Sequence, residues 1–327
     1  MNNIETIHSE FEALIGLRIL VLGDVMIDSY LWGTVDRMSP EAPVPVVSVK
    51  NREKRLGGAA NVALNLKALG CHPIVVSVIG NDADGQEMLQ LFEQNNLSTE
   101  GLILSEDRIT TIKHRIISDK HLLRVDSEQT DYLSSELEKN LFAKTQILAK
   151  EAKCFIFQDY DKGVLSPNYI KQCITLAKEK DIVTTVDPKK RNFFSYNGVT
   201  LFKPNLKEIN EAIGSSIKGT DIDGLFATAK KFGLECNIQS LLITLSENGA
   251  MLVSNKSYEY VQAHKRTIVD VSGAGDTVIS VASAFLAIGL SMEKVLSYSN
   301  LSGGLVCESI GVVPIEKNSF LEACLQL

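Results

Sequence analysis

The sequence has no uncharged apolar run of about 18 residues, the length that a membrane-spanning helix needs. Its first residues also lack a basic region followed by a long apolar stretch, so we expect no secretory signal and a cytoplasmic location. Basic residues are not in excess, since 33 Lys and Arg stand against 40 Asp and Glu and the net charge is −7. That balance argues against a general nucleic-acid binder. It does not exclude a small anionic ligand, which needs only a few local cations.

Cysteine patterns that would indicate a metal or redox site are also missing. None of the six cysteines forms a C-x-x-C pair, and no Cys and His cluster has zinc spacing. Several cysteines lie in apolar runs, for example Cys154 in "CFIFQD". We therefore expect buried, reduced thiols. No linker, repeat or low-complexity segment divides the chain, so residues 1–327 are expected to form a single domain.

What the sequence does contain is an alternation of short apolar runs and helical segments. The predicted strands are 18–24, 73–80, 154–159, 182–187, 200–205 and 241–246. Two of the clearer helical segments are 58–69 and 84–96. The strands are continuously apolar, which is typical of a parallel sheet covered on both faces. We predict an α/β fold with a doubly wound, mostly parallel sheet.

Two segments do not follow this alternation. "SPEAPVPVVSVK" (39–50) has three prolines and then alternates, and "TTIKHRIISDKHLLRVDSE" (110–128) alternates around "SDK" as a hairpin does. They predict a small antiparallel sheet outside the main one, forming a lid from about 30–50 and 108–126.

Polar residues follow many of the predicted strands, at the edge where ligands bind in parallel α/β sheets. They are Asp24, Asp28, Asp159, Asp187, Lys189, Asn205, Glu208, residues 244–247 and residues 270–276. A single such residue is often only a helix cap, but their number favours an active site.

The segment "SGAGDT" (272–277) opens a predicted apolar helix. Gly273, Ala274 and Gly275 would leave free backbone N–H groups at the helix start, which bind anions. The segment is neither a P-loop nor a full G-x-G-x-x-G fingerprint. An aspartate directly after such a turn, here Asp276, suits phosphoryl transfer to an alcohol, with the carboxylate as the base. On this segment alone, an Asp helix cap is an equally good interpretation.

A second small-residue segment, "RLGGAANVALNLKALG" (55–70), precedes another predicted helix. Gly57 and Gly58 would let a polyol approach the backbone, and Asn61 can both donate to and accept from hydroxyl groups. Taken alone, a tight loop before a closely packed helix is the better interpretation.

Together, "GGAANVALNL" and "DVSGAGDT" resemble the two signatures of the ribokinase-like (PfkB) carbohydrate kinase family, in the same order and over essentially the whole chain. The resemblance implies a ribokinase-like fold, ATP and Mg²⁺ as cofactors, and a monovalent cation that is left open. It implies that Asp276 is the catalytic base and that residues 273–275 form the anion hole. The sugar would bind to Asp28, Gly57, Gly58 and Asn61.

The same resemblance also implies which residues bind the nucleotide and Mg²⁺. "KPNLKE" matches the family's N-x-x-E motif, so Asn205 and Glu208 would organise Mg²⁺ and phosphate through water. "TLSENGAMLV" matches the nucleotide strand, which assigns Thr244, Ser246 and Gly249 to ATP, and Asn300 would line the adenine pocket.

Within the family, "LLRVDSE", "DYDKGV" and "VDPKK" resemble the D-glycero-β-D-manno-heptose-7-phosphate kinases, which phosphorylate the anomeric hydroxyl on the route to ADP-heptose. The resemblance implies the kinase alone, without the adenylyltransferase domain fused to some relatives. A phosphorylated sugar needs cations far from Asp276, and the candidates are Arg124, Lys162 and Lys189. Arg115 and Lys113 in the proposed lid are further cations, of which Lys113 is better interpreted as a solvated surface residue. Asp159 in "DYDKGV" is a further candidate for substrate binding.

Two alternatives remain open. The chain could phosphorylate another sugar or sugar phosphate, of the fructose phosphate or ribose type, or it could be a non-catalytic sugar-nucleotide sensor, against which the intact Asp276 argues. Open edges of lid strands are liabilities unless they are paired, so we expect a homodimer joined through the lids.

Overall fold

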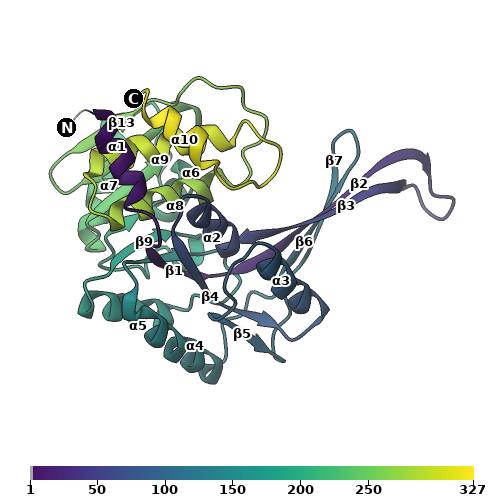
Figure 1. Cartoon of the computed structure of the whole chain (residues 1–327). Helices are drawn as coiled ribbons and strands as arrows, with labels where there is room; N and C mark the ends of the chain where they lie inside the picture. Colours follow the sequence, from purple (N-terminus) through teal and green to yellow (C-terminus); the bar gives the residue numbers. More distant parts are fainter. Residues whose placement is uncertain (1–2) are drawn as a thin grey trace.

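The computed structural model describes residues 3–327 and contains a large central sheet (Figure 1). Its strands are β1 (Arg18–Gly23), β4 (His72–Gly80), β5 (Leu102–Ser105), β8 (Cys154–Gln158), β9 (Val183–Asp187), β10 (Leu201–Phe202), β11 (Ser240–Thr244), β12 (Ala250–Ser254) and β13 (Tyr258–Val261). Their order across the sheet is β13-β12-β11-β10-β9-β8-β1-β4-β5. All pairings are parallel except those of β12 with β11 and β13.

Helices cover both faces of this sheet. They are α1 (Asn3–Glu12), α2 (Ala59–Ala68), α3 (Ala83–Gln94), α4 (Ser135–Leu148), α5 (Pro167–Glu179), α6 (Leu206–Ile213), α7 (Ile222–Glu235), α8 (Ala274–Ala287), α9 (Met292–Val306) and α10 (Lys317–Cys324). Alternate residues of β1 enter two separate hydrophobic cores: Ile19 packs in the core with α2, α8 and α9, and Leu20 packs in the core with α4, α5 and α7. The prediction of a doubly wound, mostly parallel sheet is confirmed.

The antiparallel edge formed by β12 and β13 was not predicted. The run "AMLV" (250–253) is continuously apolar, and such a run does not distinguish a parallel strand from an antiparallel one. The turn before β12 requires Gly249, whose φ is +96° and whose added Cβ would lie 2.0 Å from the carbonyl oxygen of Val261. That close approach lies at the end of β13, which pairs with β12.

A second, smaller sheet stands apart from the first. It consists of β2 (Val25–Met38), β3 (Pro45–Gly58), β6 (Ile112–Ile117) and β7 (His121–Ser127), in the order β3-β2-β6-β7. Two antiparallel hairpins form it, and the central pairing of β2 with β6 is parallel. Alternating residues predict each hairpin, but they carry no information about how two hairpins distant in the sequence pair with each other.

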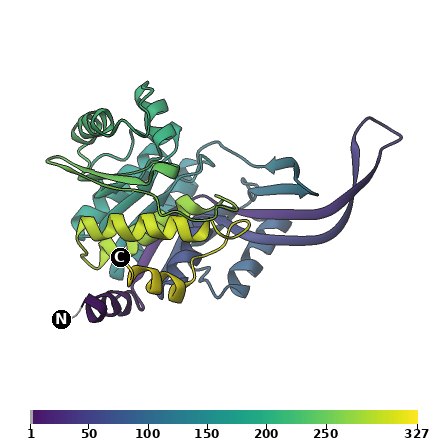
Figure 2. The same cartoon turned by 90° about the horizontal axis from the view of Figure 1, so that it is seen from above.

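The β2–β3 hairpin is longer than the segment predicted for it. It begins at Val25, directly after β1, and ends at Gly58, directly before α2. Its distal half extends well beyond β6 and β7 and away from the main body (Figure 2). The proximal half of the hairpin therefore lies close to the large sheet, and several of the predicted site residues belong to it.

Two further predictions concern features outside the site. All six cysteines are free and buried, as expected. Across residues 3–327, every helix is too short or too polar to cross a membrane.

Candidate active site

The start of α8 provides an anion-binding turn. Gly273 is the N-cap residue, with φ of +80°, a left-handed conformation that favours glycine. The first backbone hydrogen bond from within the helix is donated by Thr277 to the carbonyl of Gly273 (3.0 Å). The amide groups of Gly275 and Asp276 precede it, so they are available to a ligand at the positive end of the helix dipole.

Asp276 lies in the first turn of α8 but does not cap it. Its side chain is 5% exposed, and both carboxylate oxygens accept hydrogen bonds from other side chains. Asn61 donates to Oδ2 (2.7 Å), while Tyr160 (2.7 Å) and Gln158 (3.0 Å) donate to Oδ1. The interpretation of Asp276 as a helix cap is therefore wrong.

The environment of Asp276 suits a general base. Burial raises the pKa of its carboxyl group to about 6, against the opposing effect of the hydrogen bonds from Asn61 and Tyr160. A base with a pKa close to neutral is ionised at physiological pH and still has a useful affinity for a proton.

Asn61 itself is 0% exposed, and its amide donates to Asp276. The sugar contact predicted for Asn61 stays a prediction; in this structure its side chain binds the Asp276 carboxylate, because α2 packs against α8.

A buried ion pair lies next to the anion-binding turn. Lys203 Nζ is 3.1 Å from Asp187 Oδ1, and the two side chains are 3% and 8% exposed. A Cβ added to Gly275 would be 3.7 Å from Lys203 Nζ and 3.7 Å from Asp187 Oδ2. Sequence reasoning missed Lys203, although a lysine inside the apolar run "TLFKPN" was a usable signal, since a buried lysine needs a partner.

The Gly-Gly pair of the second motif has a packing role in this structure. A Cβ added to Gly57 would be 2.4 Å from Asp28 Oδ2, and one added to Gly58 would be 2.4 Å from the carbonyl oxygen of Asp24. Gly58 also has a φ of +61°. The two glycines therefore let β3 close over β2 while leaving room for the Asp28 carboxylate.

Asp28 belongs to a charged face of the small sheet. Its carboxylate, 4% exposed, forms a hydrogen-bonded ion pair with Arg115 of β6. The guanidinium groups of Arg115 and Arg55 lie 5.3 and 5.2 Å from the ring centre of Tyr30. Arg55, which the sequence did not single out, also donates to the carbonyl of Val312 (3.1 Å) and so ties the small sheet to the segment after α9.

The three predicted substrate cations lie in different surroundings. Arg124 on β7 is directly opposite Arg115 in the register, is 55% exposed and pairs with Asp126 (3.0 Å). Lys162 is 14% exposed and pairs with Glu128 (2.9 Å).

Lys189 lies apart from the other two predicted cations. It pairs with Glu208 of the predicted magnesium motif and lies 5.7 Å from the ring centre of Tyr160, which binds Asp276. Burial lowers the pKa of Lys189, but the charges of Asp187 and Glu208 outweigh burial and hold it above its ordinary value. Lys189 is therefore positioned between the predicted magnesium motif and the residues around Asp276.

Asp159 requires a correction, because its carboxylate is engaged in the scaffold. The side chain is 1% exposed and accepts hydrogen bonds from Tyr196 (2.8 Å) and Asn192 (3.1 Å). It holds together the loops that follow β8 and β9, and it does not face a substrate.

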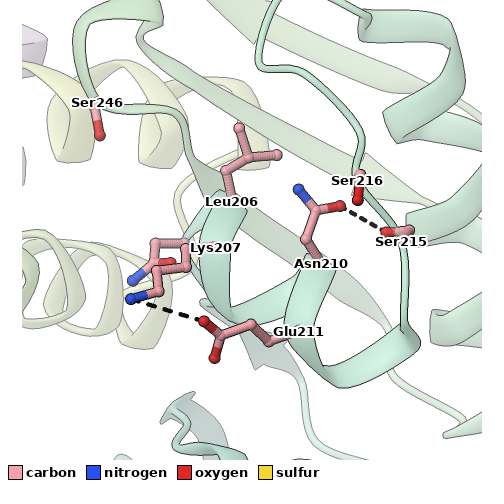
Figure 3. Close-up of a pocket in the computed structure, with 8 residues that line it drawn as sticks. Leu206, Lys207, Asn210, Glu211, Ser215, Ser216 and Ser246 are labelled. Carbon is pink, nitrogen blue, oxygen red and sulfur yellow. Dashed lines mark hydrogen bonds and ion pairs between the residues drawn. The ribbon is translucent and has the colours of Figure 1, made fainter.

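Asn205 and Glu208 form a capping box at the start of α6. The Asn205 side chain accepts from the Glu208 amide (2.8 Å), and Glu208 Oε2 accepts from the Asn205 amide (2.9 Å). The adjoining cavity has a volume of about 620 Å³, and Figure 3 shows the side chains that line it. Its lining residues are Asn205, Leu206, Lys207, Asn210, Glu211, Ser215, Ser216 and Ser246.

A metal held by several protein ligands does not fit this site. No group of three or more His, Cys, Asp or Glu side chains that could hold a metal ion occurs in the part of the chain that the structure describes. An ion reached through water does fit, because Asn205 lines the cavity, the Glu208 carboxylate is hydrogen-bonded to the Asn205 amide, and Mg²⁺ commonly keeps several waters.

The remaining predicted nucleotide residues lie on neighbouring elements. Thr244 ends β11 and bridges to Asn205, and Ser246 lines the cavity. Gly249 makes the turn into β12. Asn300 on α9 donates to the carbonyl of Gln262 (2.9 Å), which fixes the segment that follows β13.

Solved structures define the fold class. The chain is similar to phosphofructokinase-2 from Escherichia coli in complex with potassium, with a TM-score of 0.78, 17% identity and 95% and 99% of the two chains covered. It is also similar to the Arabidopsis thaliana ribokinase complexed with ribose and ATP, with a TM-score of 0.74, 15% identity and 96% and 99% covered. The fold is ribokinase-like.

The model of the pfkB family carbohydrate kinases matches residues 17–318, and the chain belongs to that family. Among the relatives, "Bifunctional protein HldE" of Aliarcobacter butzleri is 38% identical over 90% of this chain and 61% of its own length. The protein of the same name from Pelobacter propionicus is 36% identical over 98% of this chain and 65% of its own. The chain thus spans somewhat over three fifths of the length of these relatives.

Proposed function

We propose that this carbohydrate kinase transfers the γ-phosphoryl group of ATP to the anomeric (C1) hydroxyl of D-glycero-β-D-manno-heptose 7-phosphate. The product would be the 1,7-bisphosphate, a precursor of ADP-heptose for the lipopolysaccharide core. The observation that carries the reaction type is the buried Asp276 carboxylate beside the free amide groups of Gly275 and Asp276 in the first turn of α8.

In the proposed reaction, Asp276 accepts the proton of the sugar hydroxyl as that oxygen attacks the γ-phosphorus. The bond from phosphorus to the bridging oxygen breaks, and ADP leaves. The amide groups of Gly275 and Asp276 stabilise the charge on the transferred group, and the ammonium of Lys203 lies close enough to add to their field.

ATP is proposed to lie along the residues that the family resemblance assigns to it, with Ser246 near the phosphates and Asn300 near the adenine. Glu208, with Asn205, would hold Mg²⁺ through water, and the ion would supply neutralisation of phosphate charge. Lys189 pairs with Glu208 and so would face the same phosphates.

The sugar is proposed to bind between Asp28 and Asp276. Arg124 and Lys162 are the candidates for its 7-phosphate, and their present ion pairs with Asp126 and Glu128 would give way to it. The resemblance of "LLRVDSE" and "DYDKGV" to heptose-7-phosphate kinases supports this substrate.

A panel of acceptors tests the proposal. In a coupled ADP-release assay, kcat/KM for heptose 7-phosphate is expected to exceed the values for fructose 6-phosphate and ribose at least about a hundredfold, because unpaired polar groups in a site reject analogues. A chelator of Mg²⁺ is the negative control. Equal or higher kcat/KM for fructose 6-phosphate or ribose would assign the site to another sugar.

We further propose a homodimer joined through the small sheets. β7 is an edge strand of the small sheet, and its Leu123 and Val125, which point to the same face, are 54% and 47% exposed. Such an edge invites pairing with another strand.

Gel filtration with light scattering at micromolar protein is expected to give twice the chain mass, and Leu123→Lys is expected to give monomers. The matched control is Leu234→Lys on α7, a similarly exposed leucine (56%) outside the small sheet, which should leave the dimer intact. A monomeric wild type would refute the dimer.

A further inference from the structure

We propose that Tyr160 is a positioning residue for the base: together with Gln158 it occupies Oδ1 of Asp276, so that Oδ2 receives the proton of the sugar. This inference rests on the proposed function, since it takes Asp276 as the base. It concerns a loop residue that lies within the quoted segment "DYDKGV" but to which the sequence analysis gave no role.

The Asp276 carboxylate can accept only a few hydrogen bonds. Each carboxylate oxygen accepts about two hydrogen bonds. Oδ1 already accepts two, from the Tyr160 hydroxyl at 2.7 Å and from Gln158 Nε2 at 3.0 Å. Oδ2 accepts one, from Asn61 Nδ2 at 2.7 Å. Within residues 3–327, therefore, the acceptor position still open on this carboxylate is on Oδ2.

Rotating the side-chain amide of Gln158 by 180°, which would exchange Oε1 and Nε2, is unfavourable. Its Nε2 donates to Asp276 and also reaches Asp187 Oδ2 at 3.4 Å. In the opposite orientation, the Oε1 atom would face two carboxylates. The side chain is 1% exposed, so solvent would not relieve that repulsion. Gln158 is consequently held as a donor to Oδ1.

A buried carboxylate, that of Asp24, fixes the backbone of the loop that carries Tyr160. Asp24, which is 1% exposed and connects β1 to β2, accepts hydrogen bonds from the amide groups of Tyr160 (2.9 Å), Lys162 (3.1 Å) and Val164 (3.1 Å). Three bonds to one carboxylate leave the backbone at Tyr160 little freedom. The hydroxyl is therefore preorganised before a substrate arrives.

Other charges also act on Asp276, and all of them persist when the Tyr160 hydroxyl is removed. Asp187, at the end of β9, raises the pKa of Asp276, and Lys203, after β10, lowers it. Lys189 lies beside the Tyr160 ring, and the charge of Asp28 on β2 reaches the Tyr160 hydroxyl. A change produced by Tyr160→Phe therefore reports the loss of one hydrogen bond.

The test is the pH dependence of Tyr160→Phe turnover with ATP and the best sugar of the panel. The hydrogen bond favours the ionised base, so its loss should raise the pKa of Asp276, and the acid limb of kcat/KM should move up by about one pH unit. At pH 7, the smaller ionised fraction should lower kcat about twofold, and the loss of the hydrogen bond that orients the carboxylate should bring the total fall to about tenfold, while KM for each substrate stays within about twofold. Thermal unfolding verifies that the variant is folded.

Two more variants complete the experiment. Gln158→Met removes the other donor to Oδ1, and its acid limb should move in the same direction. Tyr132→Phe is the matched control, because its hydroxyl donates to Asn192 (2.9 Å) and makes no contact with Asp276; its profile should match that of the wild type.

Each outcome decides the inference. An unshifted acid limb in Tyr160→Phe, or a shift equal to that of Tyr132→Phe, would overturn it. A higher kcat/KM in Tyr160→Phe would overturn it as well, since Tyr160 would then compete with the sugar for the base. A different measurement tests the proposed function itself. If Asp276 is not the base, Asp276→Asn will keep the kcat of the wild type, regardless of the result for Tyr160→Phe.

Discussion

Asp276→Asn is expected to lower kcat about 10²- to 10⁴-fold, the range attributed to a positioned general base. An amide has nearly the same shape as a carboxylate, but it cannot accept the proton of the sugar hydroxyl. Nucleotide binding should persist, because the amide groups that begin α8 and the cavity beside Asn205 are unchanged. The measurements are ADP release for kcat and calorimetric titration for ATP.

A matched control separates loss of the base from loss of a charge near a helix start. Asp221 is the N-cap of α7 and accepts from the Gly224 amide (3.0 Å), so Asp221→Asn makes the same chemical change at a helix start without a base. Its kcat should equal that of the wild type. Turnover of Asp276→Asn close to that of Asp221→Asn would refute the mechanism.

Lys203→Met is expected to destabilise the fold by about 3–5 kcal/mol, the cost of removing one partner of a buried ion pair. The Asp187 carboxylate would be left buried without its cation, below the anion-binding turn. Urea unfolding followed by circular dichroism measures the change. Because Lys203 also lies near the proposed phosphoryl group, the folded fraction should have reduced kcat.

The control for this variant lies four residues along the chain. Lys207 is 83% exposed and pairs with Glu211 (3.7 Å), so Lys207→Met should change stability by less than about 1 kcal/mol. The double variant Asp187→Leu with Lys203→Met removes both charges, so it should recover most of the free energy of unfolding that Lys203→Met alone loses. Equal effects of Lys203→Met and Lys207→Met would mean that the buried pair contributes nothing specific.

The large sheet was predictable because each of its central strands is marked locally. Runs such as 18–24 and 154–159 are short, continuously apolar and followed by a polar residue. The edge strand β13 is not marked in this way, and the apolar run of β12 does not reveal its antiparallel direction; the pairing between β2 and β6 has no local mark either. These features depend on contacts between segments, which a local pattern does not encode.

The same distinction holds for the site. "SGAGD" indicates an anion-binding turn followed by a candidate base, because all its parts are contiguous. The partners of that base are not contiguous, since Tyr160 and Gln158 are 116 and 118 residues away from Asp276. Asn61 was singled out, but for a hydroxyl group of the ligand, because its sequence neighbours give no sign of which helix α2 packs against.

The junction at Asp24 has a consequence for how binding energy would be used. Asp28 lies on β2 of the small sheet, whereas Asp276 lies on α8, which packs in a hydrophobic core with β1 of the large sheet. A sugar bound to both aspartates, as proposed, would connect these two parts of the molecule. Part of its binding free energy would then be used to hold the two parts in the reactive arrangement. A shortened analogue that reaches only Asp28 is therefore expected to lose more in kcat than in binding affinity.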